Sequence, residues 1–196
     1  MAFFAIFQSQ FTVVAVYADQ RADLSLFKWV LEPAQVQSFN PAFIIIFAPL
    51  FAAAWTKLGE RQWASATKFD VANIIIGLSL FIFLPYVGKG EQSTPLVVLV
   101  VILFLFTIGE LFLSPVGNSL ATKVAPQAFK SRLFAVWLMS VSMGTALSGV
   151  LGSLYNPDDA AAERTFFLTL SAITIVLGVF LIAIRRWVVR KFADIR

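Results

Sequence analysis

The sequence contains no cysteine and no histidine, the two residue types that most often act as nucleophile, imidazole base or transition-metal ligand. Without cysteine there is no disulfide framework and no thiolate metal site. Without histidine the usual imidazole base and imidazole ligand are also missing. These absences exclude most hydrolase and metalloenzyme mechanisms. We therefore expect no enzyme activity, no metal and no cofactor.

Charged residues are also scarce. They make up 13% of the chain, against 59% hydrophobic and 15% aromatic residues, and the mean hydropathy is +0.84. A soluble domain of ordinary composition has about twice that share of charged residues. The composition predicts an integral membrane protein whose partner is the lipid bilayer.

Six hydrophobic segments of roughly 20 residues, the length that crosses a bilayer as a helix, follow one another along the chain. Polar or turn-forming stretches separate them. The sequence therefore predicts an all-α fold, a single six-helix transmembrane bundle over residues 1–196. The segments are 1–18, 36–55, 69–87, 96–123, 129–155 and 165–187.

Lysine and arginine are distributed unevenly between the two ends of the predicted helices. Eleven of the fifteen basic residues fall in the loops 56–68 and 123–132 and in the tail from residue 185. By the positive-inside rule these parts face the cytoplasm, as do both termini of a multi-pass protein of the plasma (inner) membrane. The net charge of +4 then reflects topology, and we expect no nucleic-acid partner.

Glu110 is the one ionisable residue well inside a hydrophobic segment. From Leu96 to Ile108 there are twelve apolar residues and one threonine, and the acid follows two residues later. A carboxylate at that depth costs several kcal/mol unless it is paired or protonated, so it indicates a functional site. The residue pattern also allows a protonated structural glutamate that bonds a neighbouring helix.

Three polar residues share the helix face of Glu110. Together with it, Thr107, Ser114 and Asn118 form what we call the polar strip, spaced at steps of three or four residues. Pro115 removes one backbone N–H, which is tolerated in a membrane where the backbone faces protein or a water-filled cavity. We expect the polar strip and the proline to face one cavity.

Other segments also carry isolated polar residues. Gln8 and Gln10 lie within the apolar first segment, where they either bond across helices or line a cavity. Asn40 precedes Pro41, which should free the carbonyl of Gln37 and create a second break with polar character, although such a pair is also common in turns.

The fifth segment combines small residues with a deep tryptophan. Trp137 is too deep for a headgroup belt, so it either packs within the bundle or walls a pocket. The small residues at four-residue steps predict close approach of another helix. They are Ser140, Gly144, Ser148 and Gly152.

Three motifs occur together in this chain: FAIFQSQFTV at 4–13, QSFNPAFIII at 37–46, and GELFLSPVG at 109–117 followed by Ala125 and Pro126. The combination resembles the proton-coupled oligopeptide transporters of the major facilitator superfamily. The motifs fall in the order and spacing of that family's seventh, eighth and tenth helices, and the similarity covers the whole chain.

The resemblance implies the C-terminal six-helix half of a transporter for small peptides and protons. By match to the family's motifs, Glu110 would hold the peptide amino group, Asn40 would hydrogen-bond its backbone, and Ser114 and Trp137 would line the pocket. One departure is Gln8, where family members often carry a glutamate tied to proton coupling.

The resemblance also implies a missing N-terminal six-helix half. Because the first segment opens directly inside a helix, we expect that something precedes it. A non-transporting membrane interaction protein and a truncated fragment therefore remain alternatives to a transporter. An intramembrane enzyme is disfavoured, because no second catalytic group shares the depth of Glu110.

Overall fold

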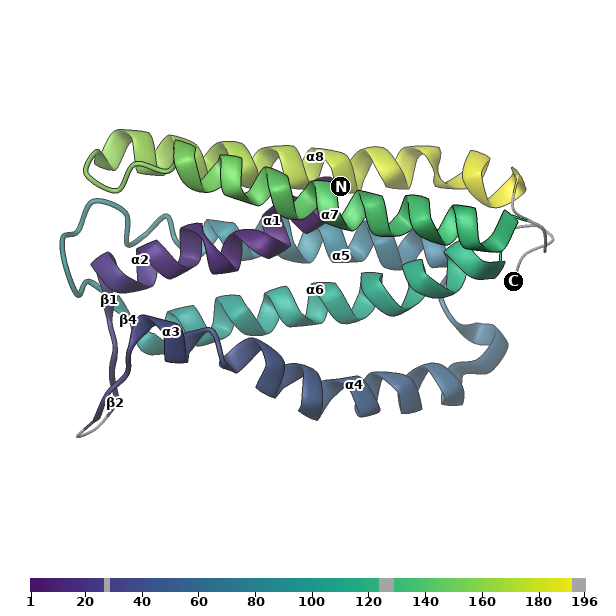
Figure 1. Cartoon of the computed structure of the whole chain (residues 1–196), viewed down its shortest axis with the longest axis horizontal. Coiled ribbons are helices and arrows are strands. Elements are labelled where there is room, and N and C mark those ends of the chain that lie inside the picture. The colour runs from purple at the N-terminus through teal and green to yellow at the C-terminus, as the bar shows by residue number, and fades with distance from the viewer. Residues whose placement is uncertain (27–28, 124–128, 192–196) are drawn as a thin grey trace.

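The computed structural model describes residues 1–26, 29–123 and 129–191, which form a bundle of long helices running roughly parallel or antiparallel (Figure 1). The all-α fold expected from the sequence is confirmed. In chain order the helices are α1 (Ala2–Gln8), α2 (Val13–Arg21), α3 (Pro33–Val36), α4 (Phe39–Leu58), α5 (Ser65–Phe81), α6 (Leu96–Lys123), α7 (Lys130–Leu154) and α8 (Ala160–Lys191).

Short extended pairs close one end of the bundle, the end at which α6 begins. Strand β1 (Ala22–Asp23) pairs in parallel with β4 (Thr94–Pro95). Strand β2 (Ser25–Leu26) pairs antiparallel with β3 (Trp29–Val30) and forms a hairpin that projects from the bundle (Figure 1).

Within the described residues, five helical stretches are long and apolar enough to cross a membrane. They are Ala2–Arg21, Pro33–Leu58, Leu96–Lys123, Lys130–Leu154 and Ala160–Ile184. The sixth, α5, has 17 helical residues, about 25 Å of rise. It then tightens into turns, with Ile82 and Phe83 bonding three residues back, before Pro85. The helix therefore begins before the expected segment 69–87, and the last residues of that segment form turns. Proline has no N–H with which to continue the helical hydrogen bonds.

Helix α5 lies at the centre of the packing, against α6 on one side and α8 on the other. Two glycines allow this close contact. A Cβ at Gly109 would lie 2.9 Å from a side-chain carbon of Ile76, and one at Gly178 would lie 2.8 Å from Ile74. Most of the core comes from large apolar side chains that are fully buried, among them Ile76, Phe83, Leu99, Leu103, Phe106 and Phe167.

The first expected segment is two helices rather than one. Residues Ser9–Phe11 form a short 3-10 turn, and Thr12 has φ −116° and ψ −80°, outside the helical region. The Ser9 hydroxyl donates to the carbonyl of Ile6, and the Thr12 hydroxyl donates to the Ser148 carbonyl of α7 at 3.2 Å. Hydroxyls that bond backbone groups compete with the helical ladder, which accounts for the break.

The second segment also breaks, but not where the sequence predicted. The turn lies at Gln37 and Ser38, and Pro41 falls in the first turn of α4, where its missing N–H disturbs little. The expectation of a freed Gln37 carbonyl is wrong, because that carbonyl accepts the backbone N–H of Asn40 at 3.3 Å.

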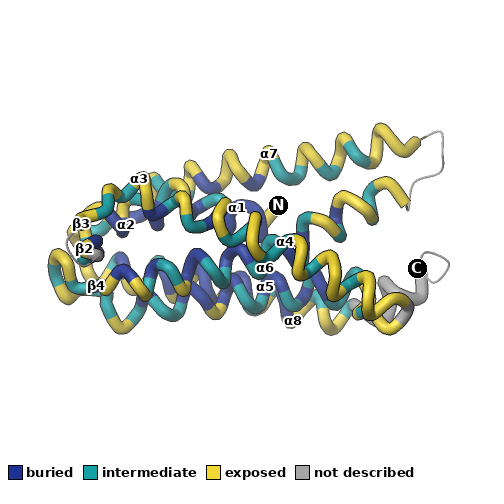
Figure 2. The backbone as a smooth tube through the Cα atoms, turned by 90° about the horizontal axis from the view of Figure 1, so that it is seen from below, coloured by how far each residue is buried: buried dark blue, intermediate teal, exposed yellow. Residues whose placement is uncertain are grey.

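The small-residue stripe of α7 receives the first helix, as its spacing indicated. A Cβ at Gly144 would lie 2.5 Å from the Cβ of Phe4, and one at Gly152 would lie 3.1 Å from Thr12. Ser140, in contrast, is only half-buried. Figure 2 shows that α4 and α7 carry mostly exposed residues, whereas α1 is largely buried and α5 and α6 combine buried with half-buried residues.

Candidate functional site

Glu110 projects from the middle of α6, and one of its two carboxylate oxygens is buried. This atom, Oε2, has no hydrogen-bond partner within residues 1–26, 29–123 and 129–191. Most buried polar groups in proteins are paired, so an unpaired carboxylate oxygen needs an explanation. The structural role left open by the sequence, a glutamate bonded to a neighbouring helix, gains no support at this oxygen.

One turn before Glu110, the polar strip is attached to α4. The side-chain amide of Asn40 donates to the Thr107 hydroxyl at 2.9 Å, and this hydroxyl donates in turn to the Leu103 carbonyl at 2.9 Å. Asn40 and Thr107 are both buried. This bond uses the amide nitrogen of Asn40 and leaves its side-chain oxygen to accept from another group.

Two turns after Glu110, the polar strip is attached to α7. The indole N–H of Trp137 donates to the side-chain oxygen of Asn118 at 2.7 Å. The indole ring lies against Gly117, and its edges meet Phe4 and Phe69, whose ring centroids are 5.6 and 6.3 Å away. The structure therefore packs Trp137 inside the bundle while leaving the side chain only half-buried.

The remaining predicted residues lie beside this line. Ser114, half-buried, occupies the turn of α6 between Glu110 and Asn118. Gln8 lies at the end of α1, and its amide donates to the Thr145 hydroxyl of α7 at 3.4 Å. It thus serves as a contact between helices, one of the two roles that the sequence left open.

Two glutamines at the helix breaks were not predicted as site residues. Gln10, in the 3-10 turn, is fully buried, and neither polar atom of its side chain has a partner in the described part of the chain. Gln37 lies at the turn before α4, and both polar atoms of its side chain are also buried without a hydrogen-bond partner among the described residues. The signal available for Gln10 was a polar side chain inside an apolar segment, and that for Gln37 was its place shortly before Asn40 and Pro41.

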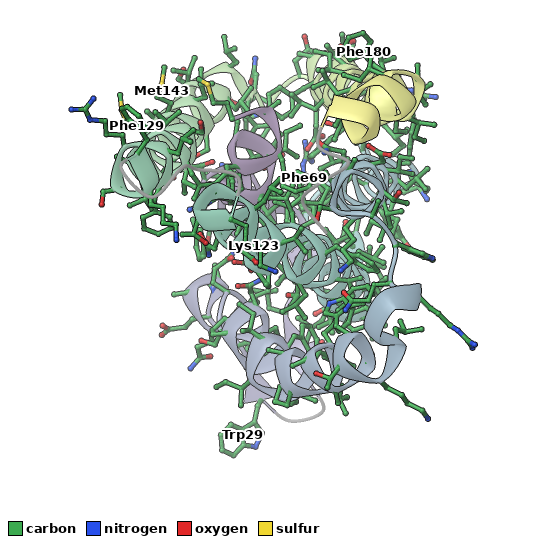
Figure 3. The ribbon with its side chains drawn as sticks, turned by 90° about the vertical axis from the view of Figure 1, so that its right-hand side faces the viewer. Trp29, Phe69, Lys123, Phe129, Met143 and Phe180 are labelled. Atoms are coloured by element: carbon green, nitrogen blue, oxygen red, sulfur yellow. The ribbon has the colours of Figure 1, made fainter. Side chains whose placement is uncertain are left out.

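Together these contacts describe a polar face of α6. Neighbouring helices bond to both ends of this face, but no described residue bonds to Oε2 of Glu110 at its centre. Seen end-on, α4 and α7 lie on different sides of α6, with Lys123 of α6 between them (Figure 3). A carboxylate in such a position can hold a cation or exchange a proton. No three Asp or Glu side chains of the described residues come together where a metal ion could bind. Ala125 and Pro126, the end of the third motif, lie outside these residues.

A second polar group lies at the end of the bundle where α8 begins. Glu163 is fully buried, and Oε1 accepts the Tyr155 hydroxyl, while Oε2 lies 3.6 Å from Nη2 of Arg21. The same guanidinium nitrogen donates to the Pro157 carbonyl. We call Arg21, Tyr155 and Glu163 the Glu163 cluster. It joins α2, the end of α7 and the first turn of α8.

Comparison with known proteins decides the family. The family model for the POT family matches residues 1–167 of the 196. The chain belongs to the POT family. Its most similar relatives include an uncharacterized transporter, YclF, from Bacillus subtilis (strain 168), 40% identical over 90% of this chain and 35% of that protein. A di-/tripeptide transporter from Lactococcus lactis subsp. cremoris is 32% identical over all of this chain and 40% of its own length.

Solved POT structures share the fold. The crystal structure of a mutant of the peptide transporter POT with alafosfalin superimposes with a TM-score of 0.86 at 38% identity, over 96% of this chain and 39% of that one. A POT family transporter in complex with 5-aminolevulinic acid gives 0.83 at 31% identity, over 93% and 38% of the two chains. The chain thus spans about two fifths of the length of the POT proteins it matches. It is a multi-pass membrane protein of a transporter family.

Proposed function

We propose that this chain forms one wall of the substrate cavity in a proton-coupled transporter of di- and tripeptides, with Glu110 as the group that holds the peptide amino terminus. The observation that carries the proposal is the buried Oε2 of Glu110 in the middle of α6, which has no hydrogen-bond partner among the residues that the structure describes. A cationic amine would supply the missing partner, and hydrogen bonds to charged groups are stronger than neutral ones. Relatives named as di-/tripeptide transporters support this substrate class.

The surrounding residues divide the remaining tasks. Asn40, whose amide nitrogen is bound to Thr107, would offer its side-chain oxygen to a peptide N–H. Ser114 would provide a hydroxyl near Glu110. Trp137, whose N–H is bound to Asn118, would contribute the apolar surface of its ring. Gln8 cannot titrate, so Glu110 is the ionisable group that this wall contributes to the cavity.

The chain would be the C-terminal bundle of the transporter, in the cell membrane. The exposed faces of α4 and α7 beside the polar strip would then be covered by the rest of the transporter, which supplies the opposite wall. The ends of α4, α6 and α8 lie together at the end marked by the C-terminus (Figure 1). This end holds Lys57, Arg61, Lys123, Lys130 and Arg132 and would face the cytoplasm.

The test is Glu110→Gln in a complete transporter that contains this chain. Glutamine keeps the size and hydrogen-bonding capacity of the side chain but removes its charge. Binding of a dipeptide with a free amino terminus should weaken by roughly 1.5 to 3 kcal/mol, the range for a hydrogen bond to a charged group. The same dipeptide with an acetylated amino terminus should bind parent and variant nearly equally, because it has no cation to lose.

Two comparisons make the test specific. Glu91→Gln, which removes an exposed carboxylate from the loop before α6, is the matched control and should leave both affinities unchanged. If the free-amine peptide binds the Glu110 variant within about twofold of the parent, Glu110 does not hold the amino terminus, and the proposal fails. A twofold change is only about 0.4 kcal/mol.

A further inference from the structure

We propose that Gly117 and Asn118 position the indole of Trp137, and that the ring held in this way limits the size of the substrate side chain on the α7 side of the cavity. The inference rests on the proposed function for its substrate, but the position of the ring is a property of this chain alone. Gly117 and Asn118 are positioning residues, because they act through Trp137.

The first contact that fixes the ring is a hydrogen bond. Asn118 Oδ1 accepts the indole N–H at 2.7 Å, a short distance for an N–H···O bond. Indole has one donor and no acceptor, so this single bond uses all of its hydrogen-bonding capacity. The bond joins α6 to α7 at one defined rotation of the Trp137 side chain.

The second contact is made by the backbone of Gly117, which has no side chain to keep the ring away. A Cβ at this position would overlap the six-membered part of the indole, at Cη2, Cζ2 and Cζ3. Any residue other than glycine would push the ring away from α6. Glycine inside a helix is less favourable than alanine by about 1 kcal/mol, so its presence here is explained by the ring and not by the helix.

Aromatic edges hold the ring from two other directions. Phe4 of α1 meets it at 75° between planes, and Phe69 of α5 meets it at 81°, both in edge-to-face geometry. Figure 3 shows Phe69 pointing into the middle of the bundle. The ring of Trp137 is thus restrained by three other helices, although the side chain remains half-buried and keeps a free surface.

The ring lies within reach of a peptide bound at Glu110. Gly117 follows Glu110 by seven residues, which is about 10 Å along the helix axis. A fully extended tripeptide spans about 10 Å. A peptide side chain directed toward the Lys123 end of α6 therefore meets the indole, and a shift of the ring changes the space available to that side chain.

The first arm of the test measures the ring itself, in the chain labelled with 5-fluorotryptophan and reconstituted in lipid nanodiscs. The 19F resonance of Trp137 is identified by its loss in Trp137→Phe. Asn118→Leu and Gly117→Ala should both shift it, whereas Asn118→Asp, which keeps an acceptor oxygen, should stay close to the parent. Ser119→Leu adds the same side chain at an exposed neighbouring position, and Gly149→Ala adds a methyl where nothing lies within 4 Å, so neither should move it.

The second arm measures selectivity in a complete transporter that contains this chain. The ratio of KM for a dipeptide with a bulky side chain to KM for diglycine should change at least threefold in Asn118→Leu and in Gly117→Ala. It should stay within twofold in Asn118→Asp and in the two control variants. Trp137→Leu should lower the ratio, because the bulky peptide gains space.

The outcomes separate this inference from the proposed function. An unmoved 19F resonance in Asn118→Leu and Gly117→Ala overturns the positioning of the ring, whatever the transporter carries. A moved resonance with an unchanged KM ratio, or an equal fall in kcat for every peptide, shows a purely structural brace and also overturns the inference. Failure of the proposed function is recognised separately, by peptide binding that is indifferent to Glu110→Gln.

Discussion

The hydroxyl of Tyr155 donates a 2.6 Å hydrogen bond to Oε1 of Glu163, a carboxylate with no exposed surface. The other oxygen of this carboxylate pairs with Arg21 at 3.6 Å. One buried group therefore holds the end of α2, the residue that follows α7 and the first turn of α8. The Glu163 cluster is remote in sequence from the polar strip, and of the two helices that bond to that strip it holds only the end of α7.

Glu163→Gln should destabilise the chain substantially. The variant keeps an oxygen for Tyr155 but leaves the Arg21 guanidinium without its anion, and breaking a buried pair costs roughly 3 to 5 kcal/mol. We expect the lower end, because the pair is 3.6 Å long and Arg21 is 15% exposed. Reversible unfolding in mixed micelles measures the free energy of unfolding. Glu91→Gln, at an exposed loop position, should change it by less than about 0.5 kcal/mol. A loss below about 1 kcal/mol in Glu163→Gln would mean that the pair contributes little.

Tyr155 should make stability depend on pH in the alkaline range. It lies outside the candidate membrane spans, and burial, helped by its hydrogen bond to Glu163, raises the pKa of its phenol above the usual value of 10. The unfolded chain then loses this proton before the folded chain does. The contribution of Tyr155 is complete below pH 10 and is lost as the pH rises above it.

The comparison with Tyr155→Phe isolates this effect, because the lysines titrate in both proteins. The difference between the two melting temperatures should stay nearly constant from pH 9 to about pH 10 and shrink from there to pH 11. A difference that stays constant over this range would show that the phenol ionises equally easily in the folded and unfolded chains.

The bond between Asn40 and Thr107 should couple α4 to α6. In a double-mutant cycle of Asn40→Leu and Thr107→Val, we expect a coupling energy near 1 kcal/mol. Cycles in membrane proteins average about 0.6 and reach about 1.7 kcal/mol, and both of these side chains are buried. Within the described part of the chain, the Thr122 hydroxyl bonds only to carbonyls of its own helix, so the coupling of Thr122→Val to Asn40→Leu should be close to zero. Equal values for the two cycles would contradict the specific bond.

The orientation of the bundle can be tested with single cysteines, because the chain has none of its own. Ala161 and Ala64 lie at opposite ends of the bundle, and both are exposed. Cysteine at Ala161 should react with an impermeant thiol reagent in intact cells, and cysteine at Ala64 should react only after permeabilisation. The reverse pattern would place the termini outside the cell.

Hydropathy was sufficient to predict the main helical segments. A segment that crosses lipid must pair its backbone N–H and C=O groups with one another, and it must be apolar over the thickness of the bilayer. The range of α6 follows from its continuous apolar run. The interruptions were harder to place. At the break Ser9–Thr12, two hydroxyls donate to particular backbone carbonyls, one of them on α7. The sequence of the first segment alone does not show which carbonyls accept these bonds.

The sequence placed four polar residues on one face of α6 but did not give their bonds, and their part in binding stays a prediction. The depth of Glu110 and its spacing from Thr107, Ser114 and Asn118 identify the polar face. Neither depth nor spacing indicates that Thr107 is bound to α4 and Asn118 to α7, since these contacts depend on how the helices pack. The role of Gly117 depends likewise on Trp137, a neighbour that is distant in sequence.

The break between α1 and α2 divides the first membrane crossing into two halves that can unfold locally and independently of each other. The α-helical bonding pattern changes to a 3-10 turn at Ser9–Phe11, and Thr12 leaves the helical region of φ and ψ, so the two halves do not form one regular helix. Each half has its own attachment, α1 at Gly144 of α7 and α2 at the Glu163 cluster. One half can therefore exchange its amide hydrogens with solvent, or tilt, while the other remains fixed.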